Sequence, residues 1–492
     1  MSAPRPARSV SDSGKGIPAA PPWVDLRLDG NQGRAPSASF FDGMLRDPEL
    51  LRCYPLDDRL ERTLADLHGL PVDRFFVGAG ADDVLDRLCR TCLEPGREAI
   101  LPVPTFEMLE RYVAQSGALA KTVPWLEGAW PRQTVLESRS PNTALVAIVS
   151  PNNPTGLVAS VADVHAVCTA FPQALVLVDA AYAEFGGEDL TRTAVAYDNA
   201  VVVRTFSKAF GLAGLRVGYA IASPRIVGWL RSVGSPFTCG TWSRAAAIHR
   251  LGTGRDEVRA YVQAIEAERI ELRAALQALG LDVLPSAGNF VFVRSDDPTW
   301  LRDALSGLGI AVRAFPAGVR ITLPGDKTAF ARLVAALAAA VQPKAMLLDL
   351  DGVLADIEGR RALASADDLQ ALAAVLPLGV VTNCPRRLAE SVLTRHGLMP
   401  HVRALVAGED GPGKPDPALV RLVLQRLGCT AAWMLGDNAS DFEAARRAGV
   451  VPLAIANGGI AGPREASSRR GAARVVDGLA ELRQLLARLL RS

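Results

Sequence analysis

Apolar runs and amphipathic stretches alternate along residues 21–341. Runs typical of buried strands lie at 75–77, 99–103, 144–149, 175–178, 200–203, 289–293, 310–313 and 318–322. Helical periodicity marks 60–67, 245–279 and 327–341. This alternation predicts an α/β domain with a largely parallel sheet over residues 21–341, in which the polar, glycine-rich stretch 25–36 is a loop.

A second series of apolar strands begins after a very short linker at residues 342–344. The strands of this series lie at 345–348, 379–381 and 433–435, and each runs directly into polar residues. They predict a second α/β domain over residues 345–492. Residues 1–20 are rich in proline, serine, alanine and glycine and have no apolar core, so they predict a disordered tail.

Composition narrows the class of protein. The 492 residues are enough for two or three domains, and 49% apolar with 22% charged residues suits soluble globular domains. A formal net charge of +2 gives no reason to expect nucleic acid or an anionic membrane surface as a partner. Seven scattered cysteines fit a reduced cytoplasm. Cys89 and Cys92 have the spacing of a redox or zinc pair, but the apolar pattern around them favours one face of a helix.

One lysine follows the apolar run 200–203, with hydroxyl groups and an arginine nearby. Burial disfavours an ammonium group, so Lys208 is poised to be neutral, and a neutral amine can form a Schiff base with an aldehyde. Thr205, Ser207 and Arg216 are the donors that a phosphate needs. The stretch therefore predicts an aldehyde that carries a phosphate, which is pyridoxal phosphate; a solvated lysine after a strand is the alternative.

Other strands of the first domain also end in residues that suit a ring-shaped cofactor. Asp179 is the last residue of a buried strand, where a carboxylate needs a cation or hydrogen-bond donors. The pyridinium nitrogen of pyridoxal phosphate would be such a partner. The alternative role for Asp179 is to cap the N-terminus of a helix. Phe106 could stack on a flat ring or act as a core aromatic. Asn153 lies in a rigid turn that can present its amide to a ligand.

Two arginines stand in apolar surroundings near the end of the first domain, Arg313 and Arg320. Arginine is suited to bidentate capture of a carboxylate or a phosphate. One such residue would fit a charge at a sheet edge, whereas two of them close together favour an anionic substrate.

These motifs, in this order, resemble the fold-type-I pyridoxal-phosphate aminotransferases, and most closely the histidinol-phosphate aminotransferase family. The resemblance implies a large mixed-sheet domain plus a small α/β domain, pyridoxal 5'-phosphate as cofactor, and a 2-oxo acid or amino acid as co-substrate. It also implies that Lys208 carries the cofactor and shuttles protons, and that Asp179 pairs with the ring nitrogen. The further contacts that it implies are Asn153 and Tyr182 on the phenolic oxygen, Phe106 on the ring face, and Ala81, Asp82, Ser207 and Arg216 on the cofactor phosphate.

The same resemblance extends to the subunit and substrate contacts. Tyr54 stands where the family reaches the phosphate of the neighbouring subunit, which implies a homodimer. Arg320 is expected at the substrate α-carboxylate or its equivalent, and Arg313 at the substrate's own phosphate. Three departures leave the substrate open: Phe106 replaces a tyrosine, 179–182 reads Asp-Ala-Ala-Tyr instead of Asp-Glu-Ala-Tyr, and 29–32 reads Asp-Gly-Asn-Gln instead of Asn-Glu-Asn-Pro.

Carboxylates and a lysine follow the strands of the second domain. Asp349 and Asp351, at i and i+2 before Gly352, would project to one side of an extended segment, where a divalent cation makes their proximity tolerable. A metal-held carboxylate can attack phosphorus, and a second one can act as acid and then base. The polar residues that follow along the chain are Thr382, Lys414, Asp437 and Asp441.

This second set resembles the haloacid-dehalogenase superfamily of phosphohydrolases, over residues 345–492. The resemblance implies a Rossmann-like domain with a minimal cap, Asp349 as nucleophile and Asp351 as general acid/base. It further implies substrate phosphate held by Thr382 and Lys414, and Mg²⁺ held by Asp349, Asp351, Asp437 and Asp441.

Together the two resemblances predict a bifunctional cytoplasmic enzyme. It would transaminate a phosphorylated amino compound, as in histidine biosynthesis, and hydrolyse a phosphate ester. The alternatives are a decarboxylase similar to phosphothreonine decarboxylases, an aminotransferase of specialised metabolism with its own phosphatase, and a regulatory or scaffolding protein.

Overall fold

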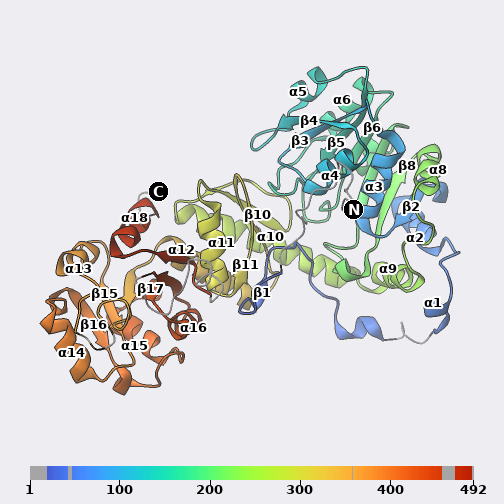
Figure 1. Cartoon of the computed structure of the whole chain (residues 1–492). Coiled ribbons are helices and arrows are strands. Elements are labelled where there is room, and N and C mark those ends of the chain that lie inside the picture. Colours follow the sequence, from blue (N-terminus) through green and yellow to red (C-terminus); the bar gives the residue numbers. More distant parts are fainter. Residues whose placement is uncertain (1–18, 43–46, 357, 359, 457–470, 490–492) are drawn as a thin grey trace, which may run out of the picture.

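The computed structural model describes residues 19–42, 47–356, 358, 360–456 and 471–489. The expected disordered tail, residues 1–20, lies outside the described residues except for Ala19 and Ala20. Three bodies follow one another along the molecule, built on a seven-stranded, a four-stranded and a six-stranded sheet (Figure 1). We call them the large, middle and carboxy-terminal bodies. None of the helices in the described part of the chain has the length and apolarity to cross a membrane.

The large body is a mixed sheet with the strand order β2-β8-β7-β6-β5-β3-β4. Its strands are β2 (Phe75–Gly78), β3 (Glu98–Val103), β4 (Leu119–Pro124), β5 (Thr143–Val149), β6 (Leu175–Asp179), β7 (Ala200–Thr205) and β8 (Gly218–Ala222). Only β8 runs antiparallel to its neighbours. Strands β6 and β7 are buried at every position, which explains why their sequences are almost continuously apolar.

Helices cover both faces of this sheet. They are α1 (Glu49–Arg52), α2 (Arg59–His68), α3 (Gly80–Cys92), α4 (Glu107–Gln115), α5 (Arg132–Glu137), α6 (Val161–Ala170), α7 (Thr191–Ala194), α8 (Pro224–Ser232) and α9 (Thr241–Thr253). Alternate strand residues enter opposite cores: Val176 and Val178 pack with α2, α6 and α9, whereas Leu175 and Leu177 pack with α3, α4 and α8. The buried thiols Cys89 and Cys92 lie on the inner face of α3, which confirms the helix-face interpretation.

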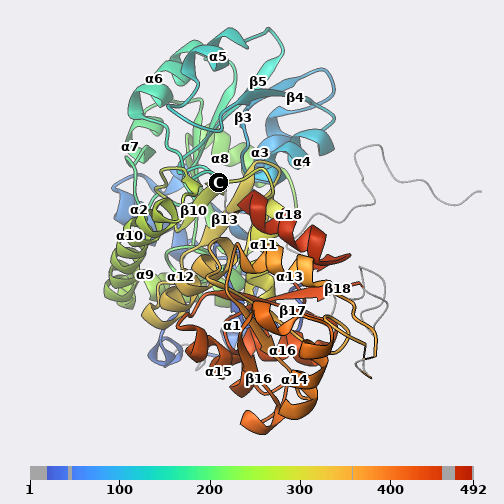
Figure 2. The ribbon, with the colours of Figure 1, turned by 90° about the vertical axis from the view of Figure 1, so that its left-hand side faces the viewer.

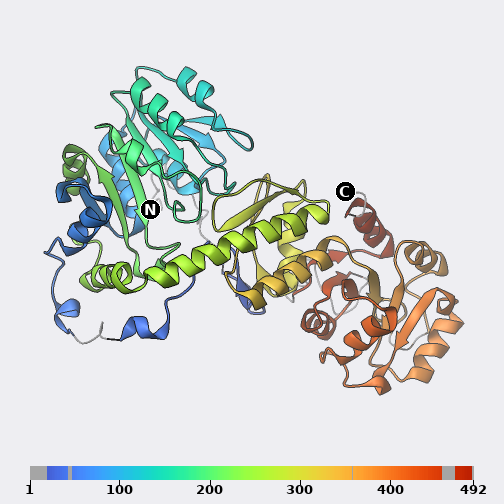
Figure 3. The same cartoon turned by 180° about the vertical axis from the view of Figure 1, so that it is seen from behind.

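The middle body joins the N-terminal segment to the chain that follows the large sheet. Its elements are β1 (Leu26–Arg27), α10 (Arg255–Ala278), β9 (Asp282–Val283), β10 (Phe290–Arg294), α11 (Pro298–Gly307), β11 (Ile310–Ala311), β12 (Arg313–Phe315), β13 (Gly318–Thr322) and α12 (Lys327–Val341). The long helix α10 runs between the large and middle bodies (Figure 3). Two expectations are corrected. The predicted loop 25–36 contains β1, and the predicted strand 310–313 is split, because β11 pairs with β1 whereas β12 pairs with β13.

The carboxy-terminal body is a parallel sheet with the order β16-β15-β14-β17-β18-β19. Its elements are β14 (Ala345–Leu348), α13 (Ala366–Ala373), β15 (Leu378–Val381), α14 (Arg386–Arg395), β16 (Val402–Val406), α15 (Ala418–Leu427), β17 (Ala432–Gly436), α16 (Ala439–Arg447), β18 (Val451–Ile455), β19 (Arg474–Val476) and α18 (Leu479–Leu489). From β14 the chain builds outward through β15 and β16 on one side and then returns to β17, β18 and β19 on the other. The crevice beyond the carboxyl end of β14 is therefore a switch point, where ligands bind in such sheets. Between β14 and β15 the described residues form only one helix, α13, so the expected minimal cap is confirmed.

The middle and carboxy-terminal bodies share one hydrophobic core. Helices α11 and α12 pack against β17 and β18 (Figure 2). At the junction the rings of Trp300 and Trp433 lie 4.8 Å apart, centroid to centroid. Trp433 is fully buried and donates its indole N–H to the carbonyl oxygen of Ala339 at 2.8 Å. The three-residue linker therefore joins two bodies that are packed together over an apolar surface.

We expect Trp433→Phe to lower the free energy of unfolding by about 1–3 kcal/mol, because it leaves a buried carbonyl without its donor and a smaller ring in the core. Chemical denaturation, monitored by far-ultraviolet circular dichroism because that signal does not rely on tryptophan fluorescence, measures this change in the free energy of unfolding. Trp229→Phe is the matched control: Trp229 is 37% exposed, and we expect a change below about 0.5 kcal/mol. Equal effects of the two substitutions would contradict a stabilising role for the junction.

Candidate active sites

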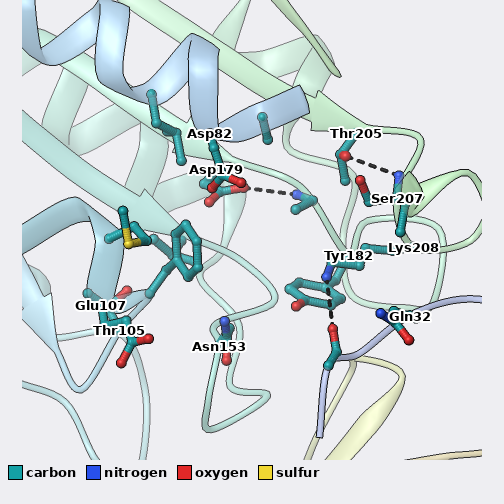
Figure 4. A pocket seen from close by; sticks show the side chains of 18 of the residues that line it. Gln32, Asp82, Thr105, Glu107, Asn153, Asp179, Tyr182, Thr205, Ser207 and Lys208 are labelled. Carbon is teal, nitrogen blue, oxygen red and sulfur yellow. Dashed lines mark hydrogen bonds between the residues drawn. The ribbon is translucent and has the colours of Figure 1, made fainter. Parts of the chain in front are cut away.

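A cavity of about 510 Å³ opens at the carboxyl edge of the large sheet, where the middle body faces it (Figure 4). Most of the residues predicted for the cofactor and the substrate line this cavity: Ala81, Asp82, Phe106, Asn153, Asp179, Tyr182, Ser207, Lys208, Arg216, Arg313 and Arg320. They meet because parallel strands end at the same edge of a sheet, and β5, β6 and β7 each deliver a polar residue there.

Lys208 lies in the tight turn after β7 and is half-buried. Its Nζ is 3.5 Å from the carbonyl oxygen of Gly30 and 5.5 Å from the centroid of the Tyr182 ring (Figure 4). A Cβ on Gly33 would come within 1.7 Å of the Lys208 carbonyl oxygen, so only glycine allows the N-terminal segment to pass this close. The amine therefore faces the cavity between the sheet and that segment.

Asp179, the last residue of β6, is only 4% exposed. Burial raises the pKa of its carboxyl to about 6, against the opposing effects of the Ala181 N–H, which it accepts at 3.1 Å, and of the Lys208 charge. Residues 180–190 form no helix, so the alternative of helix N-capping does not hold. A carboxylate in this position gains from a cationic partner inside the cavity.

Tyr182 and Asn153 are held by residues of the middle body and the N-terminal segment. The Asn31 side-chain N–H donates to the Tyr182 hydroxyl at 2.9 Å, and the Thr322 hydroxyl donates to Asn31 Oδ1 at 2.7 Å. Arg320 Nη1 donates to Asn153 Oδ1 at 2.5 Å. Asn31 was missed by motif reasoning, since it belongs to the stretch that predicted a loop; its buried position depends on the β1–β11 pairing.

The predicted phosphate contacts gather at the first turn of α3. Arg216 Nη2 donates to Asp82 Oδ2 at 3.0 Å, and its Nη1 donates to the Ser207 hydroxyl at 3.4 Å. The Asp82 carboxylate is thus a counter-ion of Arg216, while free N–H groups of a helix start, here Gly80 and Ala81, suit an anion. The cavity therefore fits a ring with three functional groups. The donors at the start of α3 suit a phosphate, the amine of Lys208 suits an aldehyde, and the carboxylate of Asp179 suits a basic nitrogen.

Two of the predicted residues, Tyr54 and Arg313, have surroundings that differ from the predicted ones. Tyr54 lies outside the cavity; it is 72% exposed, with its ring 5.1 Å from that of Phe237, so its role toward a neighbouring subunit stays a prediction. Arg313 lines the cavity, but its Nη2 donates to Glu107 Oε1 in an ion pair. Sequence reasoning also missed Glu107 as a site residue. The signal that could have found it is its position directly after Phe106, which was itself predicted to face the cofactor.

A second site lies at the carboxyl ends of β14, β15 and β17. Carboxylate oxygens of Asp349, Asp437 and Asp441 lie within 4.8 Å of one another. Lys414 Nζ stands between two of them, 2.7 Å from Asp349 Oδ1 and 2.6 Å from Asp441 Oδ1. Thr382 is buried at the end of β15. Three carboxylates against one ammonium leave excess negative charge, which a divalent cation would offset, so the residues fit Mg²⁺.

Titration of this cluster follows from burial. Burial raises the pKa of Asp349, and Asp441 adds to the rise, although Lys414 opposes it. Burial alone would lower the pKa of Lys414, but the two carboxylates outweigh it and raise that pKa. A Cβ on Gly352 would come within 2.0 Å of Asp437 Oδ2, and the backbone at Gly352 has a positive φ of 73°. For both reasons only glycine lets the turn pass this close to the cluster.

One expected ligand of this site, Asp351, lies beside the cluster, and its role toward a metal stays a prediction. Asp351 is not among the three carboxylates that converge; its Oδ2 accepts a hydrogen bond from Cys384 Sγ at 3.1 Å. The chain bends at Leu350, immediately after β14 ends at Leu348, so the two-residue period of an extended strand no longer applies. The Asp351 side chain therefore stands beside the metal cluster.

Comparison with known proteins agrees with this geometry. The family model of class I and II aminotransferases matches residues 44–337. The chain belongs to the class I and II aminotransferases. This aminotransferase also carries a haloacid dehalogenase-like hydrolase domain, whose family model matches residues 365–455. That match begins after Asp349 and Asp351, so their membership of the second site rests on the geometry at the end of β14.

Similar proteins include histidinol-phosphate aminotransferases and aromatic amino acid aminotransferases. The histidinol-phosphate aminotransferase 2 of Methylococcus capsulatus is 37% identical over 267 residues, which are 52% of this chain and 71% of the relative. An aromatic amino acid aminotransferase of Mycobacteroides abscessus is 31% identical over 64% of this chain and 93% of the relative. The solved structure of histidinol-phosphate aminotransferase from Sinorhizobium meliloti, in complex with pyridoxal-5'-phosphate, has a TM-score of 0.60 at 26% identity and covers 64% of this chain and 91% of that chain. The expected fold class and enzyme class are confirmed.

Proposed function

We propose that the protein is a bifunctional enzyme. One site performs pyridoxal-phosphate-dependent transamination of a phosphorylated amino compound, and the other performs Mg²⁺-dependent hydrolysis of a phosphate ester. The observation that carries the proposal is the convergence of reactive groups at the carboxyl edge of each sheet: Lys208 with Asp179 in the cavity of the first site, and Lys414 with Asp349 in the cluster of the second.

In the first site, Asp179 would hold the ring nitrogen, Arg216 and Ser207 the phosphate, and Phe106 the ring face. When bound, pyridoxal phosphate supplies an electron sink for the carbon that bears the substrate amine. The Lys208 amine would hold the cofactor through its aldehyde and, once released, would move the proton at that carbon. Tyr182 and Asn153 line the cavity, where the Asn31 amide donates to the Tyr182 hydroxyl and Arg320 donates to the Asn153 amide oxygen. Both would be available to hydrogen-bond the phenolic oxygen of the cofactor. Arg320 is the candidate for an anionic group next to the amine-bearing carbon.

In the second site, Asp349 would attack phosphorus through its carboxylate oxygen. Thr382 and Lys414 would hold the transferred phosphoryl group, and Asp349, Asp437 and Asp441 would hold Mg²⁺, which screens the negative charge between nucleophile and phosphate. Asp351, beside the cluster rather than in it, is free to protonate the leaving oxygen and then to activate water. The minimal cap leaves this site open to a bulky phosphate ester.

We propose domain boundaries at residues 21–341 and 345–492, and assembly as a homodimer. Large apolar side chains are exposed on the segment that follows α1, among them Tyr54 and Leu56 at 72% and 81%, and on α1 itself, where Leu51 is 77% exposed. A patch of this kind suits burial against a second copy. All seven cysteines are free thiols, which supports a cytoplasmic location.

The test is a substrate panel for the amine half-reaction. Full-length protein loaded with pyridoxal phosphate is mixed with histidinol phosphate, phosphothreonine or small amino-alcohol phosphates, and the absorbance of the bound cofactor is followed. Loss of the absorbance band, restored by a 2-oxo acid, supports transamination. Release of carbon dioxide without consumption of 2-oxoglutarate would instead identify a decarboxylase.

Cofactor affinity should depend on pH through Asp179. Below pH 6 the buried carboxyl is protonated in the cofactor-free protein, so we expect the affinity to fall by about tenfold per pH unit as the pH drops below about 5.5. The free energy of unfolding of the cofactor-free protein depends on pH in the opposite direction. Because the pKa of the Asp179 carboxyl is raised in the folded state, this group stabilises the fold at low pH, and its contribution is lost as the pH rises through about 6.

Absorbance titration of the cofactor-free protein between pH 5 and pH 8 measures the affinity. Asp179→Asn serves as the reference, because it removes the carboxyl and retains the titration of the cofactor itself. Parallel pH profiles for the two proteins would contradict this role of Asp179.

A further inference from the structure

A cavity of about 650 Å³ lies at the junction of the middle and carboxy-terminal bodies, and we call it the junction cavity. Its walls come from the segment before β1, from α12, and from the end of α16 with the turn that follows it. Among the described residues it shares no lining residue with the first cavity and none with the carboxylate cluster of the second site. Cavities of about 300–1,000 Å³ between packed bodies commonly bind small molecules, so this one is large enough for a ligand.

Positive charge is in excess around the junction cavity. In the described part of the chain its lining includes three guanidinium groups, those of Arg332, Arg446 and Arg447, and the carboxylate of Asp25. Asp25 accepts two hydrogen bonds from Arg332, at 2.9 Å and 2.6 Å, and Arg447 forms an ion pair with Glu443. Asp25 and Glu443 are also the carboxylates that act most strongly on Arg446. Each of them is thus already paired with another arginine.

Arg446 lies in the last turn of α16, and its guanidinium carbon is 5.8 Å from the centroid of the Trp23 ring. Two donors at this contact, Nη1 of Arg446 and the indole Nε1 of Trp23, are buried and have no hydrogen-bond acceptor among the described residues. The backbone at Gly471 covers one of them, since a Cβ there would come within 2.6 Å of Arg446 Nη1. A ligand in the cavity would therefore meet the other N–H groups of Arg446.

The chemistry that is missing from the junction cavity is an acceptor with a negative charge. Burial lowers the pKa of Arg446, because a cation withdrawn from water without a paired anion is disfavoured, yet an arginine stays charged at neutral pH. A phosphate or a carboxylate offsets such a cost through charge-assisted hydrogen bonds. The part of the wall that α12 supplies is apolar, with Ala335, Ala336 and Ala338. This wall suits the carbon skeleton of a molecule that is larger than one inorganic ion.

We propose that the junction cavity is a binding site for a small organic anion, whose phosphate or carboxylate group pairs with Arg446 and whose apolar part lies against the alanines of α12. Because Arg446 belongs to the carboxy-terminal body and α12 to the middle body, the bound anion bridges the two. The site goes beyond the two proposed activities and depends on neither of them.

The experiment uses two unreactive anions, phenylphosphonate and benzoate, which distinguish a phosphate-like from a carboxylate ligand. Isothermal calorimetry measures their dissociation constants with the full chain loaded with pyridoxal phosphate, in the presence of a chelator that withholds metal from the second site. We expect at least one anion to bind, and Arg446→Gln to weaken that binding at least about tenfold through the loss of a charge-assisted hydrogen bond. Arg395→Gln removes an exposed positive charge from α14 of the same body and should change the constant by less than about twofold.

A second variant tests the cavity without changing any charge. Ala335→Leu adds volume at an exposed helical position that lines the cavity, so we expect it to weaken the same binding at least about tenfold while the helix is retained. Ala331→Leu, exposed on the same helix but outside the cavity lining, is its matched control and should bind the anion normally.

The anion should also raise the midpoint of thermal unfolding of the natural protein, and should do so less in Ala335→Leu, because a ligand that binds only the folded state stabilises it. Failure of both anions to bind the natural protein overturns the proposal. Equal binding by the natural protein and Ala335→Leu does so as well, even where Arg446→Gln does not fold. The contact between Arg446 and Trp23 would then serve only to hold the two bodies together.

Discussion

Lys208→Ala is expected to lower the rate of transamination by at least about 10⁴-fold. The substitution removes the amine that bonds to the aldehyde and moves the proton at the substrate carbon, and no other lysine lines the cavity in the described part of the chain. Arg216, Ser207 and Asp179 remain, so the cofactor should still bind without a covalent bond. The loss is then chemical and does not reflect an empty site.

Two measurements identify this outcome. Borohydride treatment of the loaded natural protein, followed by peptide mass spectrometry, should place the reduced adduct on Lys208 and should give none in the variant. Lys327→Ala, an exposed lysine at the start of α12, is the matched control and should keep full activity. Phosphatase activity of Lys208→Ala should be unchanged, which excludes general unfolding. Retained amine transfer in the variant would remove Lys208 from its proposed role.

Asp349→Asn is expected to lower hydrolysis of a generic phosphate ester such as 4-nitrophenyl phosphate by at least about 10³-fold. The amide is nearly isosteric with the carboxylate, but it is a poor nucleophile and a weaker ligand for Mg²⁺. The buried Lys414 also loses one of the two carboxylates that contact it. We therefore expect both a lower rate at saturating Mg²⁺ and a higher Mg²⁺ concentration for half-maximal activity.

A chelator should abolish the hydrolysis catalysed by the natural protein, and added Mg²⁺ should restore it. Asp367→Asn, in the first turn of α13, controls for the loss of one negative charge in the same body and should hydrolyse the ester normally. Amine transfer by Asp349→Asn should equal that of the natural protein. Hydrolysis that survives both Asp349→Asn and the chelator would refute the second half of the proposed function.

The hydrophobic core that the middle and carboxy-terminal bodies share fixes how the two proposed sites are placed relative to each other. The first site lies where the middle body faces the large sheet. The middle body is in turn packed on the carboxy-terminal body, which holds the second site, through Trp300 and Trp433. The three bodies follow one another along the molecule (Figure 1). We therefore expect the two sites to keep a constant separation.

Much of each site could be read from the sequence because its residues sit at strand ends. An apolar run of three or four residues marks each of these buried parallel strands, and the polar residue that follows must lie at the carboxyl edge of the sheet. Asp179, Lys208, Asp349 and Thr382 were located in this way. Their chemistry follows from residue type, since a carboxylate or an amine at such an edge requires a partner.

Tertiary structure decided the contacts between segments that are distant in sequence. Glu107 meets Arg313 across 206 positions, and Asn31 reaches Tyr182 across 151, because the middle body and the N-terminal segment close over the large sheet. No local pattern encodes such contacts, since they depend on how whole bodies pack. The bend at Leu350 that sets Asp351 apart from the metal cluster and the tryptophan contact that joins the two bodies have the same origin. The sequence by itself determined the family, the two chemistries and most of the residues that are proposed to carry them. The packing of the bodies decided which charged groups pair with one another, because those pairs join segments that are far apart in the chain.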